Sequence, residues 1–590
     1  MFSRLVSVFS GASRGAIALG SAAGAALFGA SSPLARGLFS VPAGGVGYVT
    51  VHGYPKGFDY FVVSMLVMGA ILGGVVGGWW AVGAPRGGAT GLSSAAGHTP
   101  VRTLLASVVV FIAMLLIHDH PQARMEPFHE GEHLTPAFLY ASGSRPFGDV
   151  FVLHGLAVDG GLDALVLGDP PSPRRERRLE TLLDGATLAL LVPIAAELCV
   201  TPAGMMLGAV AGLCAMSAWW VPVFPYFRLA PLLLAVLGLL RYVRTRGNGA
   251  LFAAMAASTL GLLWSLDVGV YALMTTVLTL AVMRVGRPKL TVVALALPFL
   301  LLLLLRADIG RFVSDSFVRI PRSIDAIWSL PMRNDLSLES ARYLLPPAIY
   351  GMLLVFALRA YARGEREAAA RLLIVSVASL FAFRSAAGRC GWSHTRYGVP
   401  LLGLALVAFI AEPLVLAKRW IAGVLAVAVL IVYLEPWPNA VAAVNLAAGW
   451  HARQSHEGLV PYPLRTGKGI YTTAENAADL AALHGFLTAS TPPGAPLLDV
   501  SNERALCYFL ERKPPIRCDD IAMLSSPPLF EEAMRQLAER PPSVVIVSGS
   551  PNVDQFDGLP NRERVPRLFA WIDANYPRRH QIGRFVVATK

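Results

Sequence analysis

Charged side chains are scarce in this sequence. They make up 15% of the 590 residues, whereas hydrophobic residues make up 55%, and the mean hydropathy is +0.55. A soluble globular protein needs a larger share of polar residues to cover its surface. The composition therefore excludes an ordinary soluble protein and predicts an α-helical polytopic membrane protein.

Cysteines are also few. The five cysteines form no C-x-x-C pair, which argues against a cysteine-ligated zinc site. Two of them, Cys507 and Cys518, stand in a polar C-terminal region and could form a disulfide bond in an oxidising compartment. The sequence leaves that pairing open.

The net charge of +12 does not indicate a nucleic-acid partner. Most of the arginines lie in short connections between apolar runs, where lysine and arginine mark the cytoplasmic face of a membrane protein. They form no patch interleaved with aromatic residues, which nucleic-acid binding would favour. We therefore expect membrane lipids as partners, and no nucleic acid.

The apolar runs predict about 11–13 transmembrane helices, because a span needs about twenty apolar residues. The candidate spans are residues 12–31, 60–82, 102–117, 181–199, 203–221, 229–243, 250–265, 267–284, 291–305, 341–359, 371–385, 398–416 and 420–435. This number of spans is typical of a large helical bundle.

The basic residues predict how these helices are oriented. Placing most of the positively charged connections in the cytoplasm puts the N-terminus inside, and the long polar loops and the C-terminal tail outside. Four arginines within residues 174–178 fall on the outer side, but long loops follow the charge rule poorly. We expect a multi-pass protein of the cytoplasmic (inner) membrane.

The composition divides the chain into three parts. Residues 1–101 hold the N-terminal transmembrane helices, and residues 102–435 hold the transmembrane core with an outer loop at 118–180. Residues 436–590 are more polar and read as a small extracytoplasmic α/β domain, with strand-like runs separated by a helical stretch. The expected strands lie near 496–500, 543–547 and 583–589, and the expected helix at 529–539.

The first outer loop concentrates acidic and imidazole side chains at the membrane surface. Glu130 and Glu132 are flanked by His129 and His133, and Asp149 follows downstream. Ionisable groups at such a position are functional candidates, and partial burial can tune a carboxylate to act as a general base. Two histidines four residues apart could instead hold a metal ion with the acids. A solvated acidic loop without chemistry is the third interpretation.

A later outer loop carries the opposite charge. Residues 384–397 contain Arg384, Arg389, His394 and Arg396 together with a tryptophan and a tyrosine. Arginine side chains suit phosphate oxygens, and aromatic rings suit a sugar or a lipid headgroup. Interfacial anchoring by the aromatic residues is the alternative. Acidic and basic loops on one face together suggest a site that binds an anionic headgroup and activates a hydroxyl group.

The run HEGEHLTPAFLYASGSRPFGDVFVLHG, residues 129–155, resembles the first outer loop of the GT-C superfamily of integral-membrane glycosyltransferases, which includes protein O-mannosyltransferases and the aminoarabinose transferase. The family pattern is an acidic pair, an apolar stretch and a Gly-x-x-Pro-(Tyr/Phe)-x-Asp segment. The matching residues are Glu130, Glu132, residues 134–140, Gly143, Pro146, Phe147 and Asp149, with a small turn and Arg178 further on. His-Glu-Gly-Glu replaces the usual Asp-Glu or Asp-x-Asp, and about two extra spans precede the first core helix.

The resemblance implies a GT-C-type bundle with an outer soluble domain. It also implies transfer of a sugar from a polyprenyl-phosphate-linked donor to a hydroxyl or amine of a lipid, glycan or protein acceptor. Glu130 would be the general base, and Asp149 or Glu132 the second acid, orienting the acceptor or holding a divalent cation, the only cofactor we consider. The residues expected to bind substrate, including the departing lipid phosphate, are His129, His133, His154, Arg178, Arg384, Arg389, His394 and Arg396.

A transporter or lipid flippase without transferase activity is the alternative function. Transporters typically show repeated halves and charged groups near the middle of the membrane. The sequence shows no convincing internal repeat, and the few acidic residues within spans lie near span ends. Both observations favour the transferase.

Overall fold

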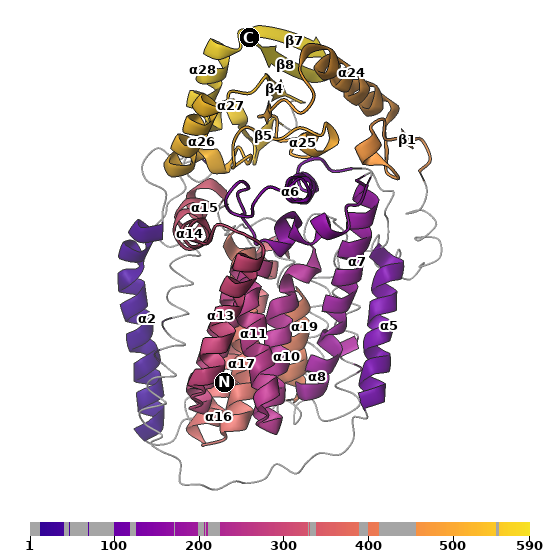
Figure 1. Cartoon of the computed structure of the whole chain (residues 1–590). Helices are drawn as coiled ribbons and strands as arrows, with labels where there is room; N and C mark the ends of the chain where they lie inside the picture. The colour runs from indigo at the N-terminus through magenta and orange to yellow at the C-terminus, as the bar shows by residue number, and fades with distance from the viewer. Residues whose placement is uncertain are drawn as a thin grey trace.

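Apolar helices run side by side in a bundle, and a small α/β domain caps one end of it (Figure 1). The computed structural model describes residues 12–39, 47, 69, 73, 100–118, 125–169, 171–198, 206, 208–209, 225–328, 330, 338–388, 399–411, 456–549 and 554–590. The predicted spans 60–82, 203–221 and 420–435 lie largely or wholly outside these residues.

The bundle helices coincide with most of the predicted apolar runs. They are α2 (Ala12–Phe39), α5 (Pro100–His118), α7 (Pro173–Ala189), α8 (Leu191–Leu198), α10 (Ala230–Thr245), α11 (Asn248–Trp264), α12 (Leu266–Met283), α13 (Pro288–Leu304), α16 (Leu338–Ala362), α17 (Arg366–Gly388) and α19 (Val399–Ala411). In the described part of the chain, five helices are long and apolar enough to cross a membrane.

Small residues set the spacing of these helices. A Cβ atom added at Gly269 of α12 would lie 2.3 Å from the carbonyl carbon of Gly261 in α11. The two helices are consecutive, and their backbones approach this closely because neither glycine has a side chain. Close helix contacts of this kind are typical of membrane bundles.

Short helices lie between the bundle and the cap, as Figure 1 shows for α6, α14 and α15. The elements are α6 (Gly131–Ala141), the π-helical turns η1 (Ala157–Gly161) and η4 (Asp315–Arg319), the 3₁₀ turns η2 (Asp163–Leu165) and η3 (Tyr226–Leu229), α14 (Ile309–Ser314) and α15 (Ile320–Trp328). Gly143, with φ of +84°, follows the end of α6, where a left-handed residue stops a helix.

The cap contains a four-stranded mixed sheet in the order β3-β4-β8-β7. Strand β3 (Leu497–Asp499) pairs in parallel with β4 (Val544–Ser548), and β8 (Phe585–Thr589) runs antiparallel to both β4 and β7 (Arg578–Ile582). The three strand positions predicted from the sequence are confirmed. The polar edge strand β7 was missed because it lacks an apolar run.

Helices and short ribbons complete the cap. The helical elements are η6 (Arg465–Gly467), α24 (Ala474–Ser490), α25 (Leu506–Phe509), η7 (Met523–Ser525), α26 (Pro527–Glu539), α27 (Asn561–Arg564) and α28 (Pro566–Asn575), and the ribbons are β1 (Val460–Pro461) with β2 (Tyr471–Thr472) and β5 (Gln555–Phe556) with β6 (Leu559–Pro560). The predicted helix at 529–539 is the body of α26. Cys507 and Cys518 are both buried free thiols, so they do not form the disulfide bond that the sequence left open.

Buried arginines attach the cap to the bundle. The guanidinium of Arg517 donates to both carboxylate oxygens of Glu532 and to Asp315, and it also donates to the carbonyl oxygen of Phe147 at 3.1 Å. Arg311 of α14 and Arg319 of η4 donate to the same Glu532 at 2.9 and 2.7 Å. Glu532 therefore pairs with three arginines at one junction, and Asp315 shares their charge.

We expect Glu532→Gln to lower the free energy of unfolding by about 3 kcal/mol at neutral pH, because it leaves buried Arg517 only partly compensated. Burial alone raises the pKa of Glu532, but Arg517, Arg311 and Arg319 outweigh it and hold that pKa below its ordinary value of 4.5. The contribution of ionised Glu532 to the free energy of unfolding is therefore fully present above pH 4.5. It is lost as the pH falls through the folded-state pKa of Glu532.

Thermal unfolding of the detergent-solubilised protein between about pH 7 and pH 2 measures this difference in free energy of unfolding. The difference in free energy of unfolding between wild type and Glu532→Gln should disappear as the pH falls through the folded-state pKa of Glu532. The neighbouring Glu531→Gln is a matched control, because among the described residues Glu531 pairs with Arg567 in an exposed ion pair that contributes little. Equal destabilisation by both variants would contradict the assignment.

Candidate functional site

Two carboxylates stand at the start of α6. Glu130 occupies the residue before the helix and Glu132 lies in its first turn, where the positive end of the helix dipole favours negative charge. Helix α6 runs between the bundle and the cap (Figure 1). The acidic pair is thus enclosed by protein on more than one side.

Glu130 is held by an arginine of α7. Arg177 donates from Nε to Oε2 at 2.9 Å and from Nη2 to Oε1 at 2.8 Å, and the Glu126 backbone N–H donates to Oε1 at 3.0 Å. Both carboxylate oxygens are therefore occupied. Burial raises the pKa of Glu130 above its ordinary value of 4.5 despite the nearby Arg177 charge.

Glu132 is held by an arginine of the cap. Arg504 Nη1 donates to Glu132 Oε1 at 2.8 Å, and the same guanidinium pairs with Asp519 at 3.2 Å and lies 3.6 Å from Asp520. Burial would raise the pKa of Glu132, but the charge of Arg504 and of nearby histidines lowers it below 4.5. Glu132 is consequently a carboxylate at neutral pH.

The approach of α6 to the cap depends on a glycine. A Cβ atom at Gly131 would lie 2.3 Å from the backbone nitrogen of Ala505. The Ala505 N–H donates to the Pro127 carbonyl at 3.0 Å, and the Thr135 hydroxyl donates to the Arg504 carbonyl at 2.6 Å. The small residue between the two acids therefore allows Arg504 to reach Glu132.

His133 lies close to three buried or partly buried carboxylates. Its Nδ1 lies 3.1 Å from Glu180 Oε1 and 4.0 Å from Asp163 Oδ2, and Glu176 completes the group. Burial by itself would lower the pKa of His133, but Glu180, Asp163 and Glu132 raise it to about 9. Burial and the charge of Glu180 raise the pKa of Asp163 to about 7. The field inside this cluster favours positive charge.

His154 and Asp159 form a dyad. Buried Asp159 accepts the backbone N–H groups of Leu153 and His154 at 2.6 and 2.8 Å, and its Oδ1 lies 3.0 Å from His154 Nδ1. Burial raises the pKa of Asp159, but the nearby histidines and its hydrogen bonds lower it overall. An ionised Asp159 holds the proton on Nδ1 and leaves Nε2 for other contacts. The imidazole ring of His154 lies nearly parallel to the Trp328 ring, with 6.2 Å between the ring centroids.

A second polar cluster continues from this dyad at the end of the bundle. The Leu266 N–H donates to the His154 carbonyl at 2.6 Å, and the next residue, Asp267, accepts from Arg228 at 3.3 Å and from Ser385 at 2.9 Å. Tyr271 contacts the Ser385 hydroxyl at 2.9 Å. Carboxylate, guanidinium and hydroxyl groups therefore line this end of the apolar helices.

The structure brings together some of the residues expected to form the site. Glu130, Glu132 and His133 lie together at the start of α6, and His154 acts electrostatically on Glu132. Arg384, near the end of α17, lies close to Tyr271. These residues come from elements far apart in the sequence.

Other expected residues lie apart from this group. Asp149 is 46% exposed and pairs with Arg145 four residues earlier, whereas Glu132 is 13% exposed. Arg178 is exposed on α7, whereas His129, which pairs with Glu126 at 2.9 Å, lies beside the group and acts electrostatically on Glu132. The remaining three, Arg389, His394 and Arg396, lie outside the described residues.

Several site residues were missed in the sequence. The partners Arg177 and Arg504, the dyad acid Asp159, and the cluster acids were not singled out. Glu176 and Glu180 are four residues apart on one helix, which could have indicated a shared face. Arg504 is separated from Glu132 by 372 residues, and no local pattern indicates such a pair.

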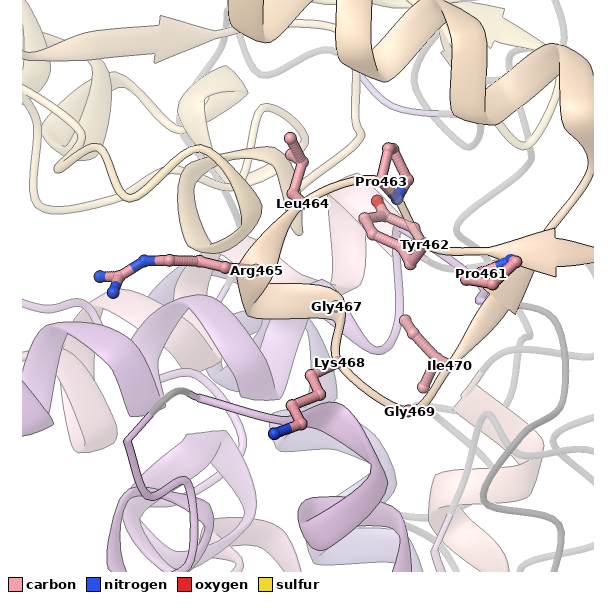
Figure 2. Close-up of a pocket in the computed structure, with 9 residues that line it drawn as sticks. All are labelled: Pro461, Tyr462, Pro463, Leu464, Arg465, Gly467, Lys468, Gly469 and Ile470. Atoms are coloured by element: carbon pink, nitrogen blue, oxygen red, sulfur yellow. The ribbon is translucent and has the colours of Figure 1, made fainter.

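A cavity of about 510 Å³ opens in the cap along residues 461–470 (Figure 2). It lies next to the start of α7, because the Ser172 hydroxyl donates to the Lys468 carbonyl at 2.7 Å. In Figure 2 the Lys468 side chain points down toward the purple helices, and the Arg465 side chain extends to the left. None of the residues expected to form the site lines this cavity.

No protein-family model and no curated protein matches the sequence. Among solved structures, the chain is similar to the crystal structure of ArnT from Cupriavidus metallidurans in the apo state. The two share 17% sequence identity with a TM-score of 0.43, and the match covers 83% of this chain and 97% of that chain. An identity this low leaves function to be argued from this chain's own side chains.

We expect Gly131→Ala to destabilise the protein by about 1–3 kcal/mol, because the new methyl group collides with the cap backbone. Alanine favours helices over glycine, so the collision has to outweigh that gain. Gly485→Ala in α24 is the control, since its Cβ would meet open space, and we expect it to be neutral or slightly stabilising. Thermal unfolding of both variants measures the contrast, and similar shifts would refute the close approach.

The Glu130–Arg177 pair predicts a double-mutant cycle. Arg177→Met should cost about 3–5 kcal/mol, because it leaves Glu130 as an uncompensated buried charge. Adding Glu130→Gln should recover most of that loss. Arg178→Met, on the next and exposed residue, should stay within about 0.5 kcal/mol of wild type. Additive effects in denaturant unfolding would show that the two side chains do not interact.

Proposed function

We propose that this protein is a GT-C-type membrane glycosyltransferase that moves a sugar from a polyprenyl-phosphate-linked donor to a hydroxyl or amine at the outer face of the cytoplasmic membrane. The observation that carries the proposal is the position of Glu132. It belongs to the motif that resembles the GT-C first loop, and it lies in an enclosed polar site at the end of an apolar bundle.

The arrangement suits a lipid-linked donor. An isoprenoid chain partitions into the hydrocarbon of the bilayer, and its phosphate remains at the boundary with water. Arg228 and Arg384 lie at that end of the bundle, close to Asp267 and Tyr271. Guanidinium groups there would neutralise the phosphate that departs with the lipid, an interaction that strengthens as the glycosidic bond breaks.

Glu132 is the best candidate for the proton acceptor. Glu130 has both oxygens occupied by Arg177 and a backbone N–H, and Asp149 is engaged by Arg145 at the surface. Arg504 binds only one oxygen of Glu132, and the depressed pKa keeps the side chain ionised at neutral pH. Glu130 then serves to hold α6 against α7.

The reaction assigned to these groups balances without a cofactor. The acceptor oxygen or nitrogen attacks the anomeric carbon, the bond from that carbon to the phosphate oxygen breaks, and the proton passes to Glu132. Polyprenyl phosphate is released. His154, fixed through Nδ1 by Asp159, presents Nε2 to orient the acceptor.

The test follows donor cleavage in proteoliposomes. Wild-type protein supplied with a labelled polyprenyl-phosphate sugar and a membrane lipid extract should release polyprenyl phosphate and transfer the label. Glu132→Gln should reduce this rate by about 10²–10⁴-fold, with unchanged membrane insertion. Glu531→Gln, in an exposed pair of the cap, should keep the wild-type rate.

Three outcomes would contradict the proposal in whole or in part. Labelled donor that crosses the vesicle membrane intact, without release of polyprenyl phosphate, would support a transporter or flippase. A fully active Glu132→Gln variant would remove Glu132 from proton transfer. If Glu130→Gln alone were inactive while folded, the proton acceptor would be Glu130.

A further inference from the structure

We propose that His133, Asp163, Glu176 and Glu180 form a structural binding site for a divalent transition-metal ion of the zinc type, which fastens α6 to α7. Each residue offers one ligand atom, and these atoms all lie within 4.8 Å of one another. The inference does not depend on the proposed glycosyl transfer.

The distances fit a closed four-ligand site. In tetrahedral zinc sites the ligand atoms are separated by about 3.3 Å, given metal–ligand bonds near 2.0–2.2 Å. The His133 Nδ1 atom lies 3.1 Å from Glu180 Oε1 and 4.0 Å from Asp163 Oδ2. Small side-chain rotations would bring all four atoms to one centre.

Unsatisfied buried atoms provide independent evidence for a ligand. Nδ1 of His133, Oδ2 of Asp163 and Oε2 of Glu176 have no hydrogen-bond partner among the described residues. These three residues are 7%, 1% and 1% exposed. Buried polar atoms are almost always hydrogen-bonded in proteins, so three orphans in one cluster indicate a missing partner. Nδ1 of His133 and Oε1 of Glu180 lie 3.1 Å apart, a separation that two ligands of one metal ion would also have.

The donor set selects the type of metal. One imidazole nitrogen with carboxylate oxygens suits zinc and neighbouring transition metals, whereas magnesium and calcium prefer six or more oxygen ligands with water. Three carboxylate side chains in one cluster also offer the negative charge that a dication requires. All four positions are supplied by protein, as in structural rather than catalytic zinc sites.

The site would join three separate elements. His133 comes from α6, Asp163 from η2, and Glu176 and Glu180 from one face of α7. The neighbouring residue of α7, Arg177, binds Glu130. A metal at this point would fix the start of α6, and with it the carboxylates of the candidate site.

Metal analysis of the full-length protein in detergent tests the inference. After chelator treatment and removal of the chelator, wild-type protein incubated with Zn²⁺ should retain one equivalent through gel filtration. Its thermal midpoint should also rise, because a ligand that binds only the folded state stabilises it. With Co²⁺ as the probe, the visible spectrum should show tetrahedral absorption.

A substitution of a proposed ligand and a matched control outside the cluster test whether the metal binds at these four residues. Glu180→Gln should weaken zinc affinity by at least about 10–100-fold and abolish the cobalt spectrum, and Glu176→Gln serves if that variant does not fold. Glu126→Gln is the matched control, because Glu126 forms a similar pair with His129 in the same segment but is more exposed. It should bind zinc like wild type.

Folded wild-type protein without stoichiometric zinc and without a tetrahedral cobalt spectrum would overturn the inference. Equal loss of binding in Glu126→Gln and Glu180→Gln would also overturn it. Metal content is measured without any substrate. A protein that binds no metal would therefore leave the transferase assignment unchanged. An active enzyme that binds no metal would separate the two conclusions.

Discussion

Neutralisation of buried carboxylates is the constraint on which this structure depends. An ionised acid removed from water costs several kcal/mol unless an opposite charge and hydrogen bonds compensate it. Arg504 reaches Glu132 from the cap, and Arg177 reaches Glu130 from α7. Each pair fixes the start of α6 to a different part of the molecule, so the position of the acidic motif is determined from two directions.

The same constraint explains how the cap sits on the bundle. Arg517 and Arg504 are both buried arginines of the C-terminal domain, and each pairs with a carboxylate from the loops of the bundle. Such pairs contribute little net stability compared with apolar packing, but they penalise any arrangement that leaves one partner uncompensated. These ion pairs therefore favour one orientation of the cap relative to the bundle. The candidate site is built at this junction.

The candidate site combines charged groups that differ in their exposure to substrate. Glu130 is sealed by Arg177, whereas Glu132 keeps one oxygen without a partner among the described residues. The His154–Asp159 dyad and Asp267 with Arg228 extend the polar surface toward the apolar helices. A reaction between a membrane-embedded carrier and a water-exposed acceptor needs such a surface at the boundary of the two media. The four-residue cluster around His133 adjoins this surface, because His133 directly follows Glu132 in α6.

Local patterns in the sequence determined most of the apolar helices and three of the four strands of the main sheet, β3, β4 and β8. A run of apolar residues long enough to span a membrane forms a helix whatever surrounds it, because every backbone group must be hydrogen-bonded within the segment. The β-branched run at 544–548 likewise became a central strand. The acidic motif at 129–133 could also be recognised in the sequence, because its residues are contiguous.

Only the tertiary structure decided which of these acids are paired, sealed or exposed. Glu132 and Arg504 are 372 residues apart, and Gly131 gives no local sign that a distant backbone packs on it. Asp149 fits the sequence motif as well as Glu132 does, yet it pairs with Arg145 at the surface. The strength of a charge depends on its distance from other charges and from water, and the fold alone sets these distances.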